Sequence, residues 1–317
     1  MGLVGTRNSL YNLVEQTQRA VSRGIKMLTV PKLKTFLVSK KHRMILDMIT
    51  NMSNRDEIVN CCITGPTGCG KTELINQYCA TTKRQLYIHD TALDIDAGSR
   101  FGFTDLVGEN GSQHTEYVPG GFLTAITTPY AVVHISEINR PENEKSLNSL
   151  LSILDDTRAI YINELKETVK VAKGVTFFAT LNEGYDYIGT IPVDEALRGR
   201  FYKMELGPLP RANMELLLPL KVGLNAEKST QLLDLVEKLS TNTQEPVYIS
   251  TRDVINIATL LKHDLPIIIA LEMVLLGAKK ANNVVESLLL QEHLSGNETF
   301  DSSDFNKYEL MTQRSGV

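Results

Sequence analysis

Residues 65–72 decide the fold of this chain and read Gly65-Pro66-Thr67-Gly68-Cys69-Gly70-Lys71-Thr72. They fit G-x-x-x-x-G-K-[ST], the pattern of a phosphate-binding P-loop. Glycines let backbone N–H groups turn inward around a phosphate, because larger side chains would block its approach. Lys71 places a positive charge near the β- and γ-phosphates, and the Thr72 hydroxyl is suited to Mg²⁺. All eight residues are therefore predicted to bind a nucleoside triphosphate.

The sequence around this loop supports the prediction. Residues 60–64 are a short apolar run that predicts a buried strand, and residues 73–80 predict the following helix. Phosphate binding by a P-loop needs a strand, a Gly-rich loop and a helix in this order, because the phosphates lie at the helix N-terminus. The alternative, a Gly-rich turn that carries Lys-Thr by coincidence, does not require this order.

Composition places the chain among ordinary globular proteins. It has 317 residues, of which 42% are apolar and 22% charged, so about two domains are expected. It contains no run of about 18 apolar residues, which predicts that no segment spans a membrane. All four cysteines fall within residues 61–79, and adjacent Cys61 and Cys62 should face opposite sides of a strand, which suits packing. The simplest expected location is the reducing cytoplasm.

Charge is unevenly distributed. Residues 1–55 are rich in lysine and arginine, although the whole chain has a net charge of −4. Such a segment could be a nucleic-acid patch, or a solvated face or contact with an acidic neighbouring subunit. Few aromatic residues are available to stack on bases in this segment, and this favours the second interpretation.

Alternating strand and helix patterns predict an α/β fold. Strands are expected over 85–89, 130–135 and 175–180, with helices over 39–52 and 141–154. Residues 94–121 form a long connection punctuated by aromatic residues, and residues 159–171 suggest a hairpin. Four parts are predicted: a basic helical extension (1–38), an α/β ATPase core with a parallel sheet flanked by helices (39–206), a smaller all-α lid (207–294) and a disordered tail (295–317).

Polar residues follow two of the predicted strands. Glu137 ends the stretch 132–137, where it could polarise the attacking water, and Ser136 precedes it where an aspartate would be expected beside Mg²⁺. Asn182 ends the next strand and could hold the γ-phosphate or the water. Arg198 and Arg200 follow, and an arginine supplied by a neighbouring subunit can stabilise transition-state charge.

Together these motifs resemble the AAA+ ATPases of the MoxR family, and most closely the CbbQ/NorQ/GvpN-like branch. The resemblance covers about residues 35–260, and its specificity comes from the order and spacing of seven stretches. They are GPTGCGKT (65–72), DLVGEN (105–110), PGGFLTAI (119–126), VVHISEINRP (132–141), FFATLNEGYDYIGT (177–190), EALRGRF (195–201) and STRDV (250–254).

The resemblance implies a six-membered ring with ATP and Mg²⁺ at each subunit interface. It implies that Lys71 and Thr72 belong to Walker A, that Glu137 is the Walker B base and that Asn182 is sensor 1. It further implies that Arg200 is the arginine finger with Arg198 beside it, and that Arg252 is sensor 2. Two insertions are implied as well: a pore-facing hairpin near 111–118 and a hairpin at 159–171 before sensor 1.

Several aromatic residues lie in or next to the connection 94–121. Phe101, Phe103 and Phe122 are expected in the core. Tyr117 is the best candidate for an aromatic residue that faces the pore.

Ser136 departs from the family pattern, which has Asp-Glu where this chain has Ser-Glu. Its hydroxyl can still hold a Mg²⁺-bound water, but one negative charge near the metal is lost. Nucleotide binding is predicted to survive and hydrolysis to be slower, because Glu137, Asn182 and Arg200 remain.

Three functions are consistent with the sequence. The leading one is an ATP-hydrolysing, chaperone-like remodelling ATPase that acts on a protein client, which the resemblance suggests carries a von Willebrand A-type domain. The second is a nucleic-acid-stimulated motor or loader that uses the basic N-terminal segment. The third is a nucleotide-gated assembly module in which Ser136 makes turnover negligible.

Overall fold

The core of the protein is a five-stranded parallel sheet. The computed structural model describes residues 28–93, 100–109, 112–141, 143–182, 193–241 and 248–276. Residues 1–27 of the predicted helical extension and the predicted disordered tail at 295–317 lie outside these residues. The strand order is β2-β5-β8-β1-β9, and the strands are β1 (Asn60–Gly65), β2 (Leu86–Asp90), β5 (Val132–Ser136), β8 (Thr176–Asn182) and β9 (Tyr202–Glu205). All of their pairings are parallel, which confirms the predicted α/β class.

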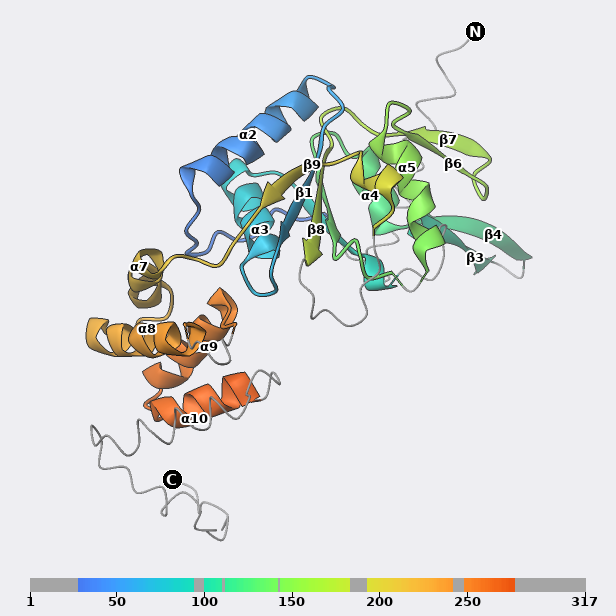
Figure 1. Ribbon diagram of the computed structural model, residues 1–317. Coiled ribbons are helices and arrows are strands. Elements are labelled where there is room, and N and C mark those ends of the chain that lie inside the picture. Colours follow the sequence, from blue (N-terminus) through green and yellow to red (C-terminus); the bar gives the residue numbers. More distant parts are fainter. Residues whose placement is uncertain are drawn as a thin grey trace. The chain divides into compact units, whose positions relative to one another are not determined.

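Helices cover both faces of this sheet (Figure 1). One face packs against α2 (Lys40–Asn54) and α3 (Lys71–Thr82) through a cluster that includes Leu46, Ile75 and Phe178. The other face packs against α4 (Gly121–Thr127) and α5 (Asn148–Leu154), with Phe122 and Leu150 fully buried. Because both faces are covered, the central strands read as continuous apolar runs in the sequence.

Local signals in the sequence explain where the flanking helices begin. Ser39 caps α2, since its hydroxyl accepts a hydrogen bond from the His42 N–H. The predicted helix at 141–154 begins later than expected, with the short 3-10 helix η2 (Glu144–Leu147) leading into α5. A second 3-10 helix, η1 (Thr91–Leu93), directly follows β2.

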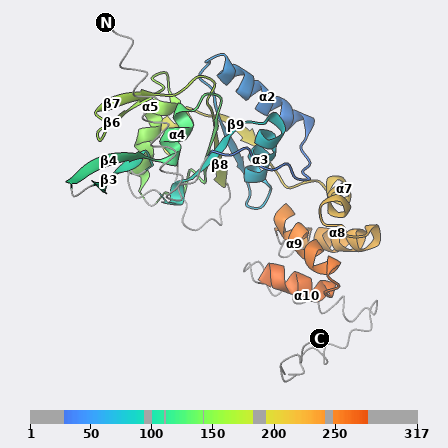
Figure 2. The same cartoon turned by 180° about the vertical axis from the view of Figure 1, so that it is seen from behind.

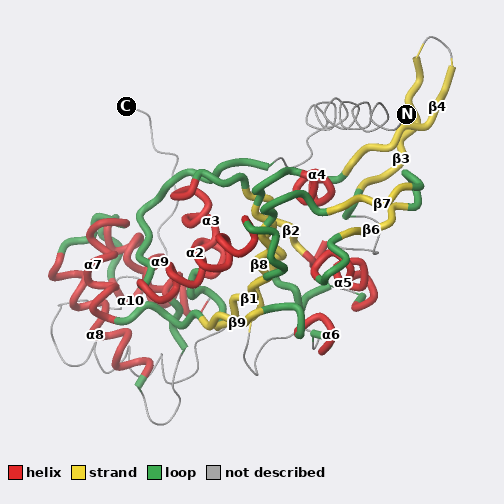
Figure 3. Tube along the Cα trace, turned by 90° about the horizontal axis from the view of Figure 1, so that it is seen from above, coloured by secondary structure: helices red, strands yellow, loops and turns green. Residues whose placement is uncertain are grey.

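Two antiparallel hairpins extend from the side of the core where α4 and α5 lie, as seen from behind in Figure 2 and from above in Figure 3. The hairpin predicted near 111–118 is formed by β3 (Gly102–Glu109) and β4 (Ser112–Pro119), so it begins earlier in the chain than predicted. The predicted hairpin at 159–171 is formed by β6 (Ala159–Ile162) and β7 (Glu167–Lys170).

Two aromatic expectations for the first hairpin are wrong. Tyr117 is buried and its hydroxyl donates to the Phe101 carbonyl at 2.8 Å, so it does not face a pore. The prediction failed because Tyr117 lies at the base of the hairpin, where it packs into the core. Phe103 was expected in the core but is exposed, whereas Phe101 and Phe122 are buried as expected.

Contacts divide the chain into two compact units. The first comprises residues 1–213 with 250–252, and the second comprises residues 214–249 and 253–317. From residue 207 onward the described residues form helices and no strand: α7 (Arg211–Lys221), α8 (Ala226–Ser240), α9 (Thr251–Lys262), α10 (Ile267–Leu271) and the π-helix η3 (Glu272–Leu276). The second unit buries several leucines, among them Leu218, Leu232 and Leu239.

Candidate active site

The P-loop connects β1 to α3, as its sequence predicted. Gly65, Gly68 and Gly70 have φ values of 148°, 80° and 101°, a region that glycine enters without steric cost. A Cβ added to Gly65 would lie 2.0 Å from the Leu206 carbonyl oxygen, and one added to Gly68 would lie 2.3 Å from the Ser250 Oγ. The loop therefore needs glycine for both its conformation and its close approach to neighbouring chain segments.

Lys71 lies across the loop at the first position of α3. Its side chain is buried, and the ammonium group donates to the carbonyls of Gly65 and Pro66, each at 2.8 Å. Thr72 follows and is exposed. Cys69 lies beneath the lysine, and burial raises the pKa of its thiol, so the thiol stays protonated and packs as a small apolar group.

Strand register brings the other predicted residues to the same edge of the sheet. Gly65 at the end of β1 pairs with Asn182 at the end of β8, and β8 lies beside β5, which ends at Ser136. The carboxyl ends of neighbouring parallel strands meet at one edge, which is where ligands bind in open α/β sheets. Ser136, Glu137 and Asn182 are therefore assembled next to the P-loop, as the sequence predicted.

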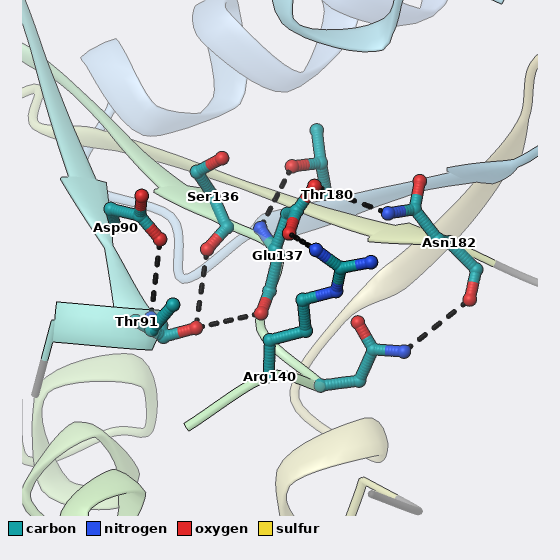
Figure 4. A network of polar contacts seen from close by, with 9 residues as sticks. Asp90, Thr91, Ser136, Glu137, Arg140, Thr180 and Asn182 are labelled. Carbon is teal, nitrogen blue, oxygen red and sulfur yellow. Dashed lines mark hydrogen bonds and ion pairs between the residues drawn. The ribbon is translucent and has the colours of Figure 1, made fainter. Parts of the chain in front are cut away.

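Both carboxylate oxygens of Glu137 are engaged (Figure 4). The Asn182 amide donates to Oε1 at 3.2 Å, and the Arg140 guanidinium pairs with Oε2 at 2.9 Å. The predicted base and the predicted sensor are thus in direct contact. Arg140 was not anticipated, although its position three residues after Glu137 is the signal that could have revealed it.

Glu137 has a strained backbone that buried hydroxyl groups hold in place. Its φ is 51°, the left-handed region that is unfavourable for a residue with a side chain. Its N–H donates to the Thr180 Oγ1 at 3.3 Å, and the Thr91 hydroxyl donates to its carbonyl at 2.6 Å. Neither threonine was predicted, because both act across strands and not within the local sequence.

His134 lies behind these contacts. It is fully buried, and its Nε2 is 3.0 Å from the Thr180 Oγ1. Burial in apolar surroundings lowers the pKa of this histidine to about 3, so the ring is neutral near pH 7. His134, Thr180 and the Glu137 backbone form one continuous set of hydrogen bonds beneath the carboxylate.

The two predicted arginines differ in their surroundings. The Arg200 guanidinium donates to the carbonyls of Leu151 and Ala196 and pairs with Asp155 at 3.1 Å. Hydrogen bonds from the backbone N–H and side chain of Thr157, together with Arg200, lower the pKa of Asp155. Arg198 is exposed at the end of α6 (Glu195–Arg198), and its side chain makes no hydrogen bond or ion pair with another described residue.

Arg252 approaches the P-loop through its backbone. Its N–H donates to the Gly68 carbonyl at 3.2 Å, and the preceding Thr251 hydroxyl accepts from the Leu209 N–H at 3.1 Å. The Arg252 side chain is exposed. The predicted sensor 2 residue therefore belongs to the segment 250–252 that packs with the first unit.

The residues at this edge have the right chemistry for a magnesium nucleotide. Hard oxygen donors suit Mg²⁺, and the edge supplies the hydroxyls of Thr72 and Ser136 with the carboxylates of Glu137 and Asp90. The P-loop glycines have the positive φ values that let backbone N–H groups turn toward a phosphate. These features define a P-loop nucleoside triphosphatase.

Comparisons with known proteins identify the family. The profile of the AAA domain, dynein-related subfamily, matches residues 60–201. The protein described as "Putative chaperone BssE" of Thauera aromatica is 35% identical over 270 residues, which are 85% of this chain and 91% of that protein. The uncharacterized protein YojN of Bacillus subtilis (strain 168) is 30% identical over 186 residues, or 58% of each chain. The chain therefore belongs to the AAA family in its dynein-related subfamily, whose domain binds ATP.

Solved structures match this chain at a lower level of similarity. The RuvB Holliday junction branch migration motor of Thermotoga maritima superposes with a TM-score of 0.48 and 14% identity, covering 87% of this chain and 76% of that chain. This similarity says nothing about function. Among the described residues, no helix is long and apolar enough to cross a membrane.

Proposed function

We propose that this chain is an ATP-hydrolysing remodelling ATPase of the MoxR type, in the CbbQ/NorQ/GvpN-like branch, that works as a six-membered ring on a protein client. One observation carries the proposal: the Glu137–Asn182 contact lies at the strand edge that holds the P-loop. A water-activating carboxylate and a γ-phosphate sensor are useful only beside a nucleotide that is to be hydrolysed.

The chain's own residues account for each part of hydrolysis. Lys71 exchanges its bonds to the Gly65 and Pro66 carbonyls for bonds to phosphate oxygens. Glu137 accepts a proton from the attacking water, while Asn182 orients that water or the γ-phosphate. Thr72, and Ser136 through a water, would hold Mg²⁺, which would supply positive charge to offset that of the phosphates. Because Ser136 carries no charge, hydrolysis is slower than with aspartate at this position.

A neighbouring subunit completes the site in this proposal. Arg200 reaches the neighbour's nucleotide by exchanging the carboxylate of Asp155 for phosphate oxygens, with Arg198 beside it. Arg252 acts as sensor 2 from the start of α9. Movement of the helical segment after residue 207 then transmits the nucleotide state to a client.

A protein client is favoured over nucleic acid. The relative from Thauera aromatica is described as "Putative chaperone BssE", and the match covers 91% of its length. The family resemblance suggests a client with a von Willebrand A-type domain. Exposed Phe103 on the first hairpin and Tyr161 on the second are available for protein contacts.

The test combines assembly and client capture in the full-length protein. Light scattering should show a higher mass with a slowly hydrolysed ATP analogue than with ADP. A Glu137→Gln variant loaded with ATP should retain a protein partner that a Lys71→Ala variant does not retain. A monomer under every nucleotide condition would contradict the ring, and recovery of DNA without protein would favour a nucleic-acid motor.

A further inference from the structure

Ser136 has an acidic neighbour on the next strand. Asp90 is the last residue of β2, and it pairs in register with Ser136, the last residue of β5. The two residues are 46 positions apart in the sequence, but paired residues of adjacent parallel strands lie about 4.8 Å apart. Figure 4 shows them side by side at the edge of the sheet.

Both side chains point to the face of the sheet that carries the P-loop helix. Successive residues of a strand alternate between faces, so Asp90 shares a face with Leu86, and Ser136 shares one with Val132. Leu86 and Val132 both belong to the buried cluster that contains Leu74 of α3. Since α3 begins at Lys71, Asp90 and Ser136 project toward the helix whose first turn should hold the metal and phosphates.

The end of β2 is fastened to the turn that contains Ser136 and Glu137. Thr91 is fully buried, and its hydroxyl lies 3.2 Å from the Ser136 carbonyl oxygen and 2.6 Å from that of Glu137. The Ala92 N–H donates to the Asp90 Oδ1 at 3.1 Å. This bond from the backbone two residues further on holds the Asp90 carboxylate in place. The carboxylate makes no ion pair with a described residue.

The carboxylate of Glu137, at the same edge, already has a partner for each of its oxygens. Glu137 binds Arg140 and Asn182 with its two oxygens. The strands β2, β5 and β8 end at Asp90, Ser136 and Asn182, and of these residues Asp90 is the one with a negative charge. No cationic side chain of a described residue pairs with it. This charge stands one strand away from the position where the family has an aspartate.

We propose that Asp90 and Ser136 together replace that aspartate. The Ser136 hydroxyl accepts a hydrogen bond from a Mg²⁺-bound water and donates its own hydrogen to the Asp90 carboxylate. A carboxylate behind the hydroxyl makes the serine oxygen a better acceptor and restores one negative charge near the metal. The inference rests on the proposed function, because it assumes a magnesium nucleotide at the P-loop.

The measurement separates metal binding from turnover. The Kd of a fluorescent ADP analogue is measured with saturating Mg²⁺ and again in EDTA, and Mn²⁺ binding to the nucleotide complex is followed by electron paramagnetic resonance. Asp90→Asn should weaken metal binding about 10–100-fold, as loss of an outer-shell partner typically does. The metal-free Kd should not change, because asparagine keeps an oxygen for the Ala92 N–H.

The matched control is Asp156→Asn, which removes an equal charge from an exposed position after α5 and should leave both constants unchanged. A second comparison uses Ser136→Asp, which restores the family residue. In that background, Asp90→Asn should have little or no effect on metal binding, since the pair is no longer needed.

Two results would overturn the inference and leave the proposed function standing. In the first, Asp90→Asn binds the metal as tightly as the Asp156→Asn control does. In the second, Asp90→Asn weakens metal binding equally in the wild-type and Ser136→Asp backgrounds. If the wild type binds no nucleotide in either buffer, the proposed function fails and this inference fails with it. The two failures are therefore distinguishable.

Discussion

At the scale of single residues, Glu137 is the group whose removal should separate binding from hydrolysis. Its carboxylate contacts Asn182 and Arg140, and its backbone is held by Thr91 and Thr180. Because the surrounding bonds fix the backbone independently of the side chain, a side-chain change here should leave the fold intact.

We expect Glu137→Gln to reduce the rate of ATP hydrolysis by roughly 10²–10⁴-fold, because glutamine cannot accept the proton of the attacking water. Phosphate release measures the rate, and a fluorescent nucleotide should show an almost unchanged Kd for ATP. Glu167→Gln, at an exposed position of the second hairpin, is the control. Undiminished hydrolysis in Glu137→Gln would mean that another residue is the base.

The buried histidine predicts how stability depends on pH. The pKa of His134 falls from 6.5 to about 3 on folding, so below pH 6.5 the unfolded chain binds a proton that the folded chain does not. The contribution of His134 is fully present above pH 6.5 and is lost as the pH falls, by up to about 1.4 kcal/mol per pH unit.

Urea unfolding of wild type and His134→Gln at several pH values between 4 and 7 measures this loss. The variant cannot titrate, so its free energy of unfolding should fall less steeply on acidification than that of the wild type. Equal slopes would show that His134 takes up its proton in the folded state as well.

At the scale of structural elements, the P-loop depends on glycine where the chain packs closely. Gly68 has a φ of 80°, and the Ser250 side chain occupies the place of its missing Cβ. Its carbonyl also accepts from the Arg252 N–H. The loop is therefore shaped by a segment far from it in sequence as well as by its own glycines.

Gly68→Ala should displace residues 250–252 and weaken nucleotide binding, because the new Cβ would lie 2.6 Å from the Cβ of Ser250. A positive φ adds a strain of about 1–2 kcal/mol for alanine. Titration with a fluorescent nucleotide checks this. Gly207→Ala is the matched control, since no atom lies within 4 Å of the Cβ added there. Equal affinities of the two variants would contradict the packing argument.

At the scale of the whole molecule, each active site of the proposed ring contains residues from two neighbouring chains. One chain supplies Lys71 and Glu137, and its neighbour supplies Arg200. In the structure Arg200 pairs with Asp155 of its own chain, with the two side chains 27% and 32% exposed. A partly exposed ion pair contributes little free energy, so phosphate can replace it at low cost.

Mixing two inactive variants tests this sharing. Arg200→Ala alone should lose about 10³–10⁵-fold in rate if it removes an arginine finger, and Glu137→Gln is inactive for the reason given above. A mixed ring contains interfaces that combine an intact Glu137 with an intact Arg200, so mixing should restore part of the wild-type rate. Thermal unfolding of Arg200→Ala controls for the loss of its bonds to Leu151 and Ala196. If mixtures stay inactive although both variants fold and assemble, Arg200 does not act in trans.

The sequence by itself determined the local features of this protein. The P-loop pattern predicted β1, the loop and α3, and the residues that end the apolar runs identified Ser136, Glu137 and Asn182 as candidate site residues. These features are local because each depends on a motif or a periodicity within a short window of the chain.

Only the tertiary structure decided which distant residues complete the site. Asp90 stands beside Ser136 and Thr91 holds Glu137 because strand order and register place segments 46 residues apart in contact. Asp155 binds Arg200 because the end of α5 packs against α6. The same holds for Tyr117, whose burial depends on how the hairpin meets α4 and not on its own strand. A sequence pattern fixes which face of a strand a residue occupies, but the neighbouring strand, which no local pattern names, decides what that residue touches.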